Sequence, residues 1–248
     1  MKSALRFVGL LLLALLALQL YFILRIAAMA VIAPESTTFE RSEAWRIVSE
    51  KGRLPWSQQW VPYAQISGNL KRAVIASEDD GFSTHGGVDW DAIKKAWDKN
   101  AKAEQRAAAR KPVAPQDANA KPSKPPKIIG GSTITQQLAK NLFLAGERTL
   151  LRKGQELVVT LLLEQLLSKE RILEIYLNHV EWGEGVFGAE AAAQHYFRKP
   201  ASKLNAYEAS RLAVMLPRPR YFEKLPNSAY VAVRASVIVA RMGDAQLP

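Results

Sequence analysis

The sequence predicts a mainly α-helical protein with a single transmembrane helix at its N-terminus. One observation is an apolar run at residues 7–24 that only Gln19 interrupts. The other is that apolar residues recur at helical spacing through most of residues 133–241, where no stretch alternates as a strand would. A chain of 248 residues has room for this anchor and one compact domain with its own core.

The apolar run is long enough to cross the hydrocarbon core of a bilayer as a helix. Lys2 and Arg6 precede it, so the positive-inside rule places the N-terminus in the cytoplasm and the chain from about Arg25 outside. A cleaved signal peptide is the alternative, but its apolar region would normally span about 7–15 residues, fewer than here. We therefore expect residues 1–33 to form a cytoplasmic tip and an uncleaved anchor.

Beyond the anchor, residues 34–69 are expected to form a stalk and the entry to a domain at residues 70–248. Residues 98–127 are rich in Ala, Lys and Pro, and they predict a basic insertion that is a mobile loop or an interrupted helix. The apolar spacing predicts helices at residues 70–77, 133–144, 150–167, 169–177, 189–197, 206–216 and 230–241.

The formal net charge of +11 favours an anionic partner such as lipid headgroups, phosphates or nucleic acid. The anchor argues against nucleic acid, and the sequence has no zinc-finger, basic-zipper or RNA-binding aromatic signature. Without cysteine the chain has no disulfide or thiol chemistry. Its three histidines lack the spacing of metal ligands, so we predict no protein-held metal site.

Residues 130–141 place a glycine turn, hydroxyls, amides and a lysine at the start of a helix. Thr133 and Gln136 fit a capping box, so the helix should begin near Ile134 with its first amides facing an anionic, oxygen-rich ligand. Gln136 and Lys140 would share one face. The alternative is an ordinary capped helix with a solvated polar face.

A first carboxylate, Glu78, lies at the predicted end of a helix, before Asp79 and Asp80 and near Phe82. Partial desolvation there can tune an acid or a base. The alternative is that Asp79 and Asp80 only terminate the helix, and we interpret His85 as structural.

A second carboxylate, Glu164, interrupts an otherwise apolar helix, on the same face as Lys153 and Thr160. Such a group needs a task or a partner, so a buried ion pair is the alternative. Arg152 and Glu156, four residues apart, are expected to pair as scaffold. Two carboxylates separated by a basic cluster suggest that one moves a proton while cations hold a phosphate leaving group.

At this point the sequence resembles the bacterial peptidoglycan glycosyltransferases of family 51, most closely their monofunctional biosynthetic members. The resemblance lies in ordered blocks at residues 78–87, 130–141, 152–164, 175–197 and 208–219. It implies a lysozyme-like α-helical domain that polymerises lipid II, a lipid-linked disaccharide pentapeptide, into linear β-1,4 glycan strands. Polyprenyl diphosphate would be released, and the domain would lie on the periplasmic face of the bacterial inner membrane.

The resemblance implies that Glu78 is the general base, which deprotonates the 4-hydroxyl of the acceptor sugar as it attacks the donor's anomeric carbon with inversion. Glu164 matches the second family glutamate, which assists on the diphosphate side through a divalent cation, Mg²⁺ or Mn²⁺. No organic cofactor is expected. The substrate-binding residues would be Asp79, Ser132, Thr133, Gln136, Gln137, Lys140, Asn141, Arg148, Arg152 and Lys153. The structural residues of the motifs would be Phe82, His85, Gly87, Gly130, Gly131, Glu156, Tyr176, Asn178, Gly183 and Gly188.

The expected partners are lipid II, the growing glycan strand, anionic membrane lipids that the 98–127 insertion would contact, and division or elongation wall-synthesis proteins. Neither Ser-x-x-Lys nor Lys-Thr-Gly occurs, so we expect no transpeptidase activity. One rival is a membrane-anchored, lysozyme-like lytic enzyme, against which the basic cluster at Lys140 to Lys153 argues. The other is a non-catalytic protein that binds wall precursors, against which the presence of both Glu78 and Glu164 argues.

Overall fold

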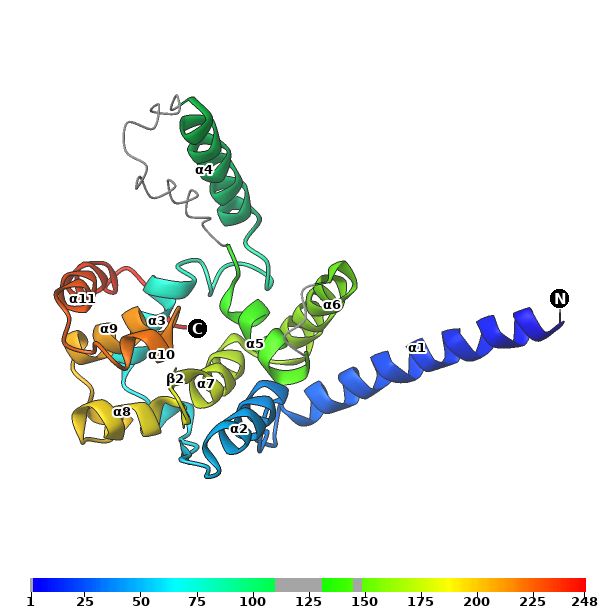
Figure 1. Ribbon diagram of the computed structural model, residues 1–248, viewed down its shortest axis with the longest axis horizontal. Helices are drawn as coiled ribbons and strands as arrows, with labels where there is room; N and C mark the ends of the chain where they lie inside the picture. The colour runs from blue at the N-terminus through cyan, green and yellow to red at the C-terminus, as the bar shows by residue number, and fades with distance from the viewer. Residues whose placement is uncertain (1, 110–130, 145–148) are drawn as a thin grey trace, which may run out of the picture.

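The computed structural model describes residues 2–109, 131–144 and 149–248, which form a helical body from which the helices at residues 2–28 and 90–109 project (Figure 1). The predicted mainly α fold is confirmed. The helices are α1 (Lys2–Ala28), α2 (Thr38–Lys51), α3 (Gly68–Glu78), α4 (Trp90–Ala109), α5 (Ile134–Phe143), α6 (Leu150–Leu166), α7 (Lys169–His179), α8 (Ala189–Phe197), α9 (Ala206–Met215), α10 (Pro219–Phe222) and α11 (Ala229–Arg241).

Helix α2 lies in the segment for which the sequence predicted only a stalk. It begins with a capping box between Thr37 and Glu40 and ends at Gly52, whose φ is 65°. Only Glu40 and Ile47 of this helix are fully buried, so it lacks the apolar stripe that reveals a helix in a sequence. Its local signals were the cap and the glycine stop.

The basic insertion is partly described. Residues 98–109 are the second half of α4, which is one continuous helix from Trp90 to Ala109. Residues 110–127 lie outside the described part of the chain. The helix projects from the body in Figure 1.

A small sheet in the order β1-β3-β2 was not predicted. Strand β1 (Ser57–Gln58) is parallel to β3 (Val186–Phe187), with Ser57 opposite Val186. Strand β2 (Glu181–Gly183) is antiparallel to β3. Strands this short show no alternation in a sequence.

The core holds two groups of helices together. Helix α9 packs against α3 and α11, whereas α5 packs against α6, α2 and α7. Trp182, Tyr176 and Phe82 are among the largest fully buried side chains, and the indole N–H of Trp182 donates to the Leu212 carbonyl oxygen at 3.1 Å. The C-terminal end of α3 and the N-terminal end of α5 thus come from different packing groups and meet at one place.

Helix α1 is long and apolar enough to cross a membrane, by length and composition. Its C-terminal end is docked on the body rather than free, because Phe22 and Ile26 are buried and the Phe22 ring lies 5.2 Å from that of Phe143. The Gln19 amide, which interrupts the apolar run, donates to Gln155 of α6 at 3.2 Å. The rest of α1 extends away from the body, with the N-terminus at its far end (Figure 1).

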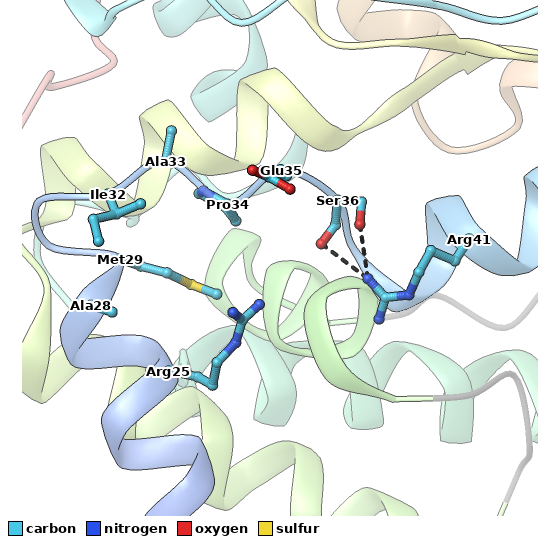
Figure 2. Close-up of a pocket in the computed structure, with 9 residues that line it drawn as sticks. All are labelled: Arg25, Ala28, Met29, Ile32, Ala33, Pro34, Glu35, Ser36 and Arg41. Carbon is cyan, nitrogen blue, oxygen red and sulfur yellow. Dashed lines mark hydrogen bonds between the residues drawn. The ribbon is translucent and has the colours of Figure 1, made fainter.

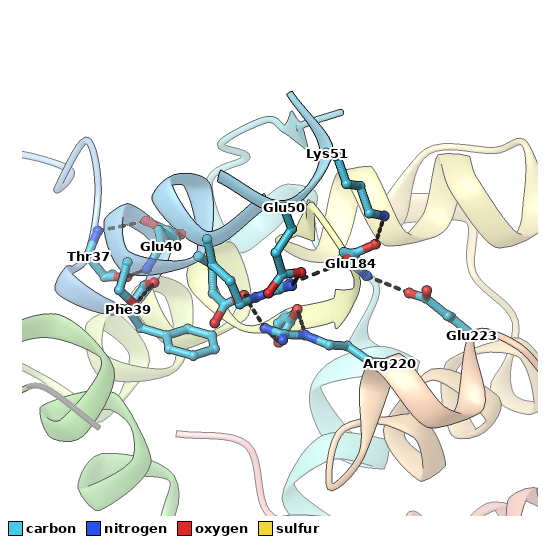
Figure 3. A network of polar contacts seen from close by, with 12 residues as sticks. Thr37, Phe39, Glu40, Glu50, Lys51, Glu184, Arg220 and Glu223 are labelled. Carbon is cyan, nitrogen blue, oxygen red and sulfur yellow. Dashed lines mark hydrogen bonds and ion pairs between the residues drawn. The ribbon is translucent and has the colours of Figure 1, made fainter. Parts of the chain in front are cut away.

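A network of charged side chains ties α2 to the small sheet and to α10 (Figure 3). Arg46 pairs with Glu43 at 2.8 Å and with Glu184 at 3.0 Å, and Lys51 also pairs with Glu184. Arg220 reaches Glu181 at 2.8 Å. The network joins the segment that follows the anchor to the body of the domain.

Candidate active site

Asp79 joins the two helix ends that meet at the site. Its Oδ2 accepts from the backbone N–H of Ile134, the first residue of α5, at 2.9 Å. Its Oδ1 lies 2.8 Å from Nε2 of His85, and the side chain is 3% exposed. A carboxylate at a helix N-terminus satisfies a free amide and complements the helix dipole. Both oxygens of Asp79 therefore have structural partners, although Asp79 was predicted to bind substrate.

His85 is held in one tautomer. Its Nδ1 accepts from the backbone N–H of Gly87 at 3.1 Å, so its Nε2 carries the proton that faces Asp79. This arrangement agrees with the structural interpretation of His85.

The carboxylate of Glu78 is held by a chain of two hydrogen bonds. The Tyr176 hydroxyl donates to Oε1 of Gln137 at 3.0 Å, and Nε2 of Gln137 donates to Oε2 of Glu78 at 3.0 Å. Burial raises the pKa of the Tyr176 phenol well above its ordinary value, so it remains a donor. The orientation of the Gln137 amide, and with it that of the carboxylate, follows from that donor.

Burial is the main reason why the pKa of Glu78 is raised above its ordinary value. The hydrogen bond from Gln137 lowers that pKa, and the neighbouring charge of Asp79 raises it. A carboxylate with a raised pKa is a stronger base near neutral pH than an exposed one. Of the predicted catalytic residues, Glu78 has the electrostatics of a proton acceptor.

The predicted capping box at the start of α5 is confirmed. Thr133 Oγ1 accepts from the Gln136 N–H, and the Gln136 side chain accepts from the Thr133 N–H, both at 3.1 Å. The Thr133 hydroxyl also donates to the Gly87 carbonyl oxygen at 2.6 Å. Both side chains are buried in this cap, so it is Gln137, and not Gln136, whose amide faces Glu78.

Glu164 lies at a junction between helices. Its Oε1 pairs with Lys169 Nζ at 2.9 Å and accepts from the Thr135 hydroxyl at 2.5 Å, and its side chain is 8% exposed. Gly87 has a φ of 85°, and a Cβ there would lie 2.7 Å from Glu164 Cγ. This geometry matches the alternative of a buried ion pair. It does not place Glu164 with the predicted diphosphate cations.

The carboxylate that does lie among those cations is Glu156. It pairs with Arg152 at 2.8 Å and with Lys153, and it is 4% exposed. The predicted Arg152–Glu156 pair is thus confirmed. Nε of Arg152 is buried and has no hydrogen-bond partner among the described residues. A buried donor of this kind is available to hydrogen-bond an anionic ligand.

Lys140 of α5 belongs to the same cluster and is exposed. Partial desolvation lowers its pKa, the charge of Glu156 raises it, and those of Arg152 and Lys153 lower it. Lys140 follows Gln137 by three residues, and such side chains are neighbours on a helix, with Cβ atoms about 5–6 Å apart. Helix α5 therefore connects the carboxylate of Glu78 to the basic cluster.

A cavity of about 230 Å³ opens beside Glu78. It lies between the end of α3, the start of α4 and the start of α5, and both carboxylates and hydroxyls face it. Its lining includes Ser77, Glu78, Asp80, Asp89, Ser132 and Arg241.

Most of the other predicted site residues are packed within the domain. Phe82 is fully buried, Gly131 packs against Ile93, and Asn141 is half-buried on α5. The amide of Asn178 bonds both backbone groups of Val61, at 2.9 and 3.0 Å. A Cβ on Gly183 would lie 2.6 Å from Glu223 Oε2, and one on Gly188 2.7 Å from the Asn178 carbonyl oxygen. Gly130 and Arg148 lie outside the described residues.

Sequence reasoning missed the partners of Glu164. Lys169 Nζ lies over the Phe82 ring, 4.5 Å from its centroid, as well as beside Glu164. A lysine five residues after an intrahelical glutamate was the only signal, and a turn separates the two. Thr135 belongs to the 130–141 motif, but the direction of its side chain depends on how α5 is rotated about its axis, which the sequence does not give.

The described residues do not fit a divalent cation held by protein ligands alone. Among them, no group of three or more His, Cys, Asp or Glu side chains could hold a metal. Glu156 and Glu164, moreover, are each paired with a basic side chain.

Comparison with known proteins shows the family of the chain. The model of the Transglycosylase family matches residues 47–109 and 117–243, which include Glu78 and the basic cluster. The chain belongs to this family. A biosynthetic peptidoglycan transglycosylase of Burkholderia thailandensis is 54% identical over 233 residues, 94% of this chain and 83% of that protein. Those of Burkholderia ambifaria and Burkholderia vietnamiensis are 54% and 53% identical, over 94% of this chain and 86% of each.

The contact between Gly87 and α6 can be tested with two neighbouring glycines. We expect Gly87→Ala to destabilise the full chain by about 1–3 kcal/mol, because it forces an unfavourable backbone angle and a clash with Glu164. A Cβ at Gly86 would meet no atom within 4 Å, so Gly86→Ala should change stability by less than about 0.5 kcal/mol. Thermal unfolding in detergent measures both. Equal midpoints for the two variants would contradict the packing described.

The chain of hydrogen bonds to Glu78 predicts a pH effect. Gln137→Ala removes the bond that lowers the pKa of Glu78, so that pKa should rise. Because only the ionised carboxylate accepts a proton, the acid limb of the pH–rate profile of a transglycosylase assay should move to higher pH. Gln165→Ala, an exposed change on α6, is the control. An acid limb that does not move in Gln137→Ala would mean that Gln137 does not hold the base.

Proposed function

We propose that this chain polymerises lipid II into linear β-1,4 glycan strands, with Glu78 as the general base and polyprenyl diphosphate as the leaving group. The observation that carries the proposal is the arrangement on α5. Gln137 holds a half-buried carboxylate with a raised pKa, and Lys140, one turn away, belongs to a cluster of three cations. Family membership and the names of the relatives support the same activity.

The proposed step uses these groups in sequence. Glu78 takes the proton of the acceptor 4-hydroxyl as that oxygen attacks the anomeric carbon of the donor. The bond between that carbon and the diphosphate breaks, and the configuration inverts. Negative charge grows on the departing diphosphate, where Lys140, Arg152 and Lys153 stabilise it.

Three other carboxylates take different parts in this proposal. Glu156 fixes Arg152 and Lys153 in place, so it positions the cations on the diphosphate side. Glu164 positions the start of α5 through its hydrogen bond from Thr135, and its side chain packs against Gly87. Lys169 balances its charge. Asp79 likewise positions Glu78, rather than binding substrate. Ser132, Asn141 and Arg148 complete the proposed substrate contacts.

The membrane arrangement follows from α1 and from the substrate. Lys2 and Arg6 favour a cytoplasmic N-terminus, and the catalytic domain then lies on the outer, periplasmic face, where wall precursors are polymerised. Exposed Lys99 and Lys102 on α4 supply part of the charge that attracts anionic lipids. Division or elongation wall-synthesis proteins are the proposed protein partners.

The activity is tested with full-length protein in detergent, labelled lipid II and preformed uncross-linked glycan, with products resolved by size. Wild type should convert lipid II to long polymer and leave the glycan intact. Glu78→Gln should make no polymer, because an amide accepts no proton at neutral pH. Shortened glycan would instead indicate a lytic enzyme. If neither substrate changed, the chain would instead be a non-catalytic protein that binds wall precursors.

The same variant has a predicted effect on stability. The folded-state pKa of Glu78 is above its unfolded value, so its contribution is most favourable below the unfolded pKa and is lost as pH rises through the folded pKa. At pH 7, Glu78→Gln should therefore unfold at the same temperature as wild type or a higher one. At pH 4 this advantage should shrink. A lower midpoint at pH 7 would show that inactivity came from loss of structure.

A further inference from the structure

A cavity of about 340 Å³ lies where the anchor meets the domain, and its lining shares no residue with the active site described above (Figure 2). Its volume is in the range of small-ligand sites. One wall is apolar and consists of the end of α1 and the residues after it. Two arginines, a serine and a glutamate supply the polar side chains. Its lining is Arg25, Ala28, Met29, Ile32, Ala33, Pro34, Glu35, Ser36 and Arg41.

The walls of this junction cavity are held in place by the domain. The Met29 carbonyl oxygen accepts from Nε of Arg171 at 2.7 Å, and the Pro34 carbonyl oxygen lies 3.1 Å from Nε2 of buried His179. The segment between α1 and α2 ends at Thr37, the N-cap of α2. The connection between anchor and domain is therefore a defined structure, which a specific ligand requires.

The two arginines suit an anion. Arg41 is oriented by bonds from Nη1 to the Ser36 hydroxyl at 2.9 Å and from Nη2 to the Thr38 hydroxyl at 3.1 Å. In the described part of the chain, the Nε of Arg41 has no acceptor, and the side chain of Arg25 has no hydrogen bond or ion pair there. Glu35 lines the cavity too, but it forms no ion pair with either arginine. Figure 2 shows the guanidinium of Arg25 directed into the space before Ser36.

The position of Arg25 relates the cavity to the membrane. The apolar run ends at residue 24, so Arg25 lies at the boundary between hydrocarbon and headgroups. The positive-inside rule disfavours basic residues close to the outer end of a spanning helix. The positive-inside rule therefore does not explain why an arginine lies at the outer end of α1. An anionic ligand that binds Arg25 would explain it.

We propose that the junction cavity binds the phosphate of an anionic phospholipid of the outer leaflet. Arg25 and Arg41 donate to the phosphate oxygens, and the apolar wall of Ala28, Met29 and Ile32 contacts the glycerol and the first acyl carbons. The bound lipid fixes the height and tilt of the domain above the bilayer. This inference rests on the proposed function only in that α1 spans the membrane with the domain outside.

The test is native mass spectrometry of the full chain in detergent, titrated separately with phosphatidylglycerol, phosphatidylcholine and lipid II. Wild type should bind one phosphatidylglycerol more tightly than phosphatidylcholine. Arg25→Gln combined with Arg41→Gln should weaken phosphatidylglycerol binding about tenfold or more, the loss expected from two charge-assisted contacts. The control combines Arg53→Gln with Arg234→Gln, which removes the same charge from exposed positions and should leave binding unchanged.

Three outcomes would overturn the proposal: an equal loss in the control, no preference for phosphatidylglycerol in wild type, or a loss of lipid II binding alone. Arg25→Gln by itself guards against misfolding, because that side chain has no bond to the described part of the chain. It should show a weaker form of the same loss. The readout involves no turnover, so failure here is distinguishable from failure of the polymerisation assay.

Discussion

The carboxylate of Asp79 is the interaction on which the active site depends. It accepts from the Ile134 amide at the start of α5 and from the Nε2 proton of His85, and Asp79 is the residue that follows the end of α3. Glu78 is adjacent to it in the chain, and Gln137 lies on the first turn of the capped helix. One buried carboxylate thus sets the distance between the proposed base and the residue that orients it. Because α5 also carries Lys140, the same contact sets the position of the base relative to the diphosphate cations.

The active site contains charged and polar groups whose surroundings in the free protein are energetically unfavourable. Desolvation raises the pKa of Glu78 above its ordinary value and lowers that of Lys140 below its own. Arg152 keeps a buried donor without a partner in the described chain. Groups that are only partly satisfied in the free protein can be satisfied by the substrate, which is how binding energy is directed to the reacting atoms. The rigid cap and the packed Gly87 keep these groups in place meanwhile.

Local patterns in the sequence predicted part of this structure. The cap of α5 depends on residues three apart, so Thr133 and Gln136 revealed it, and the long apolar helices followed from their periodicity. The choice between Gln136 and Gln137 did not follow, because adjacent helical residues point about 100° apart and only packing fixes the rotation. The bond from Ile134 to Asp79 spans 55 residues, and no local rule sets it. The assignment of Glu164 to the diphosphate side likewise rested on resemblance, whereas the carboxylate that pairs with Arg152 and Lys153 is Glu156.

The most direct test of the account is the pH–rate profile of Asp79→Asn, with kcat and KM for lipid II measured at each pH. The asparagine must turn a donor toward either Ile134 or His85, so the alignment of Glu78 is lost and kcat should fall about tenfold or more. Loss of the Asp79 charge also lowers the pKa of Glu78, so the acid limb should move to lower pH with KM little changed. A raised KM with an unmoved acid limb would contradict the account, because it would make Asp79 a substrate ligand and not the group that positions the base.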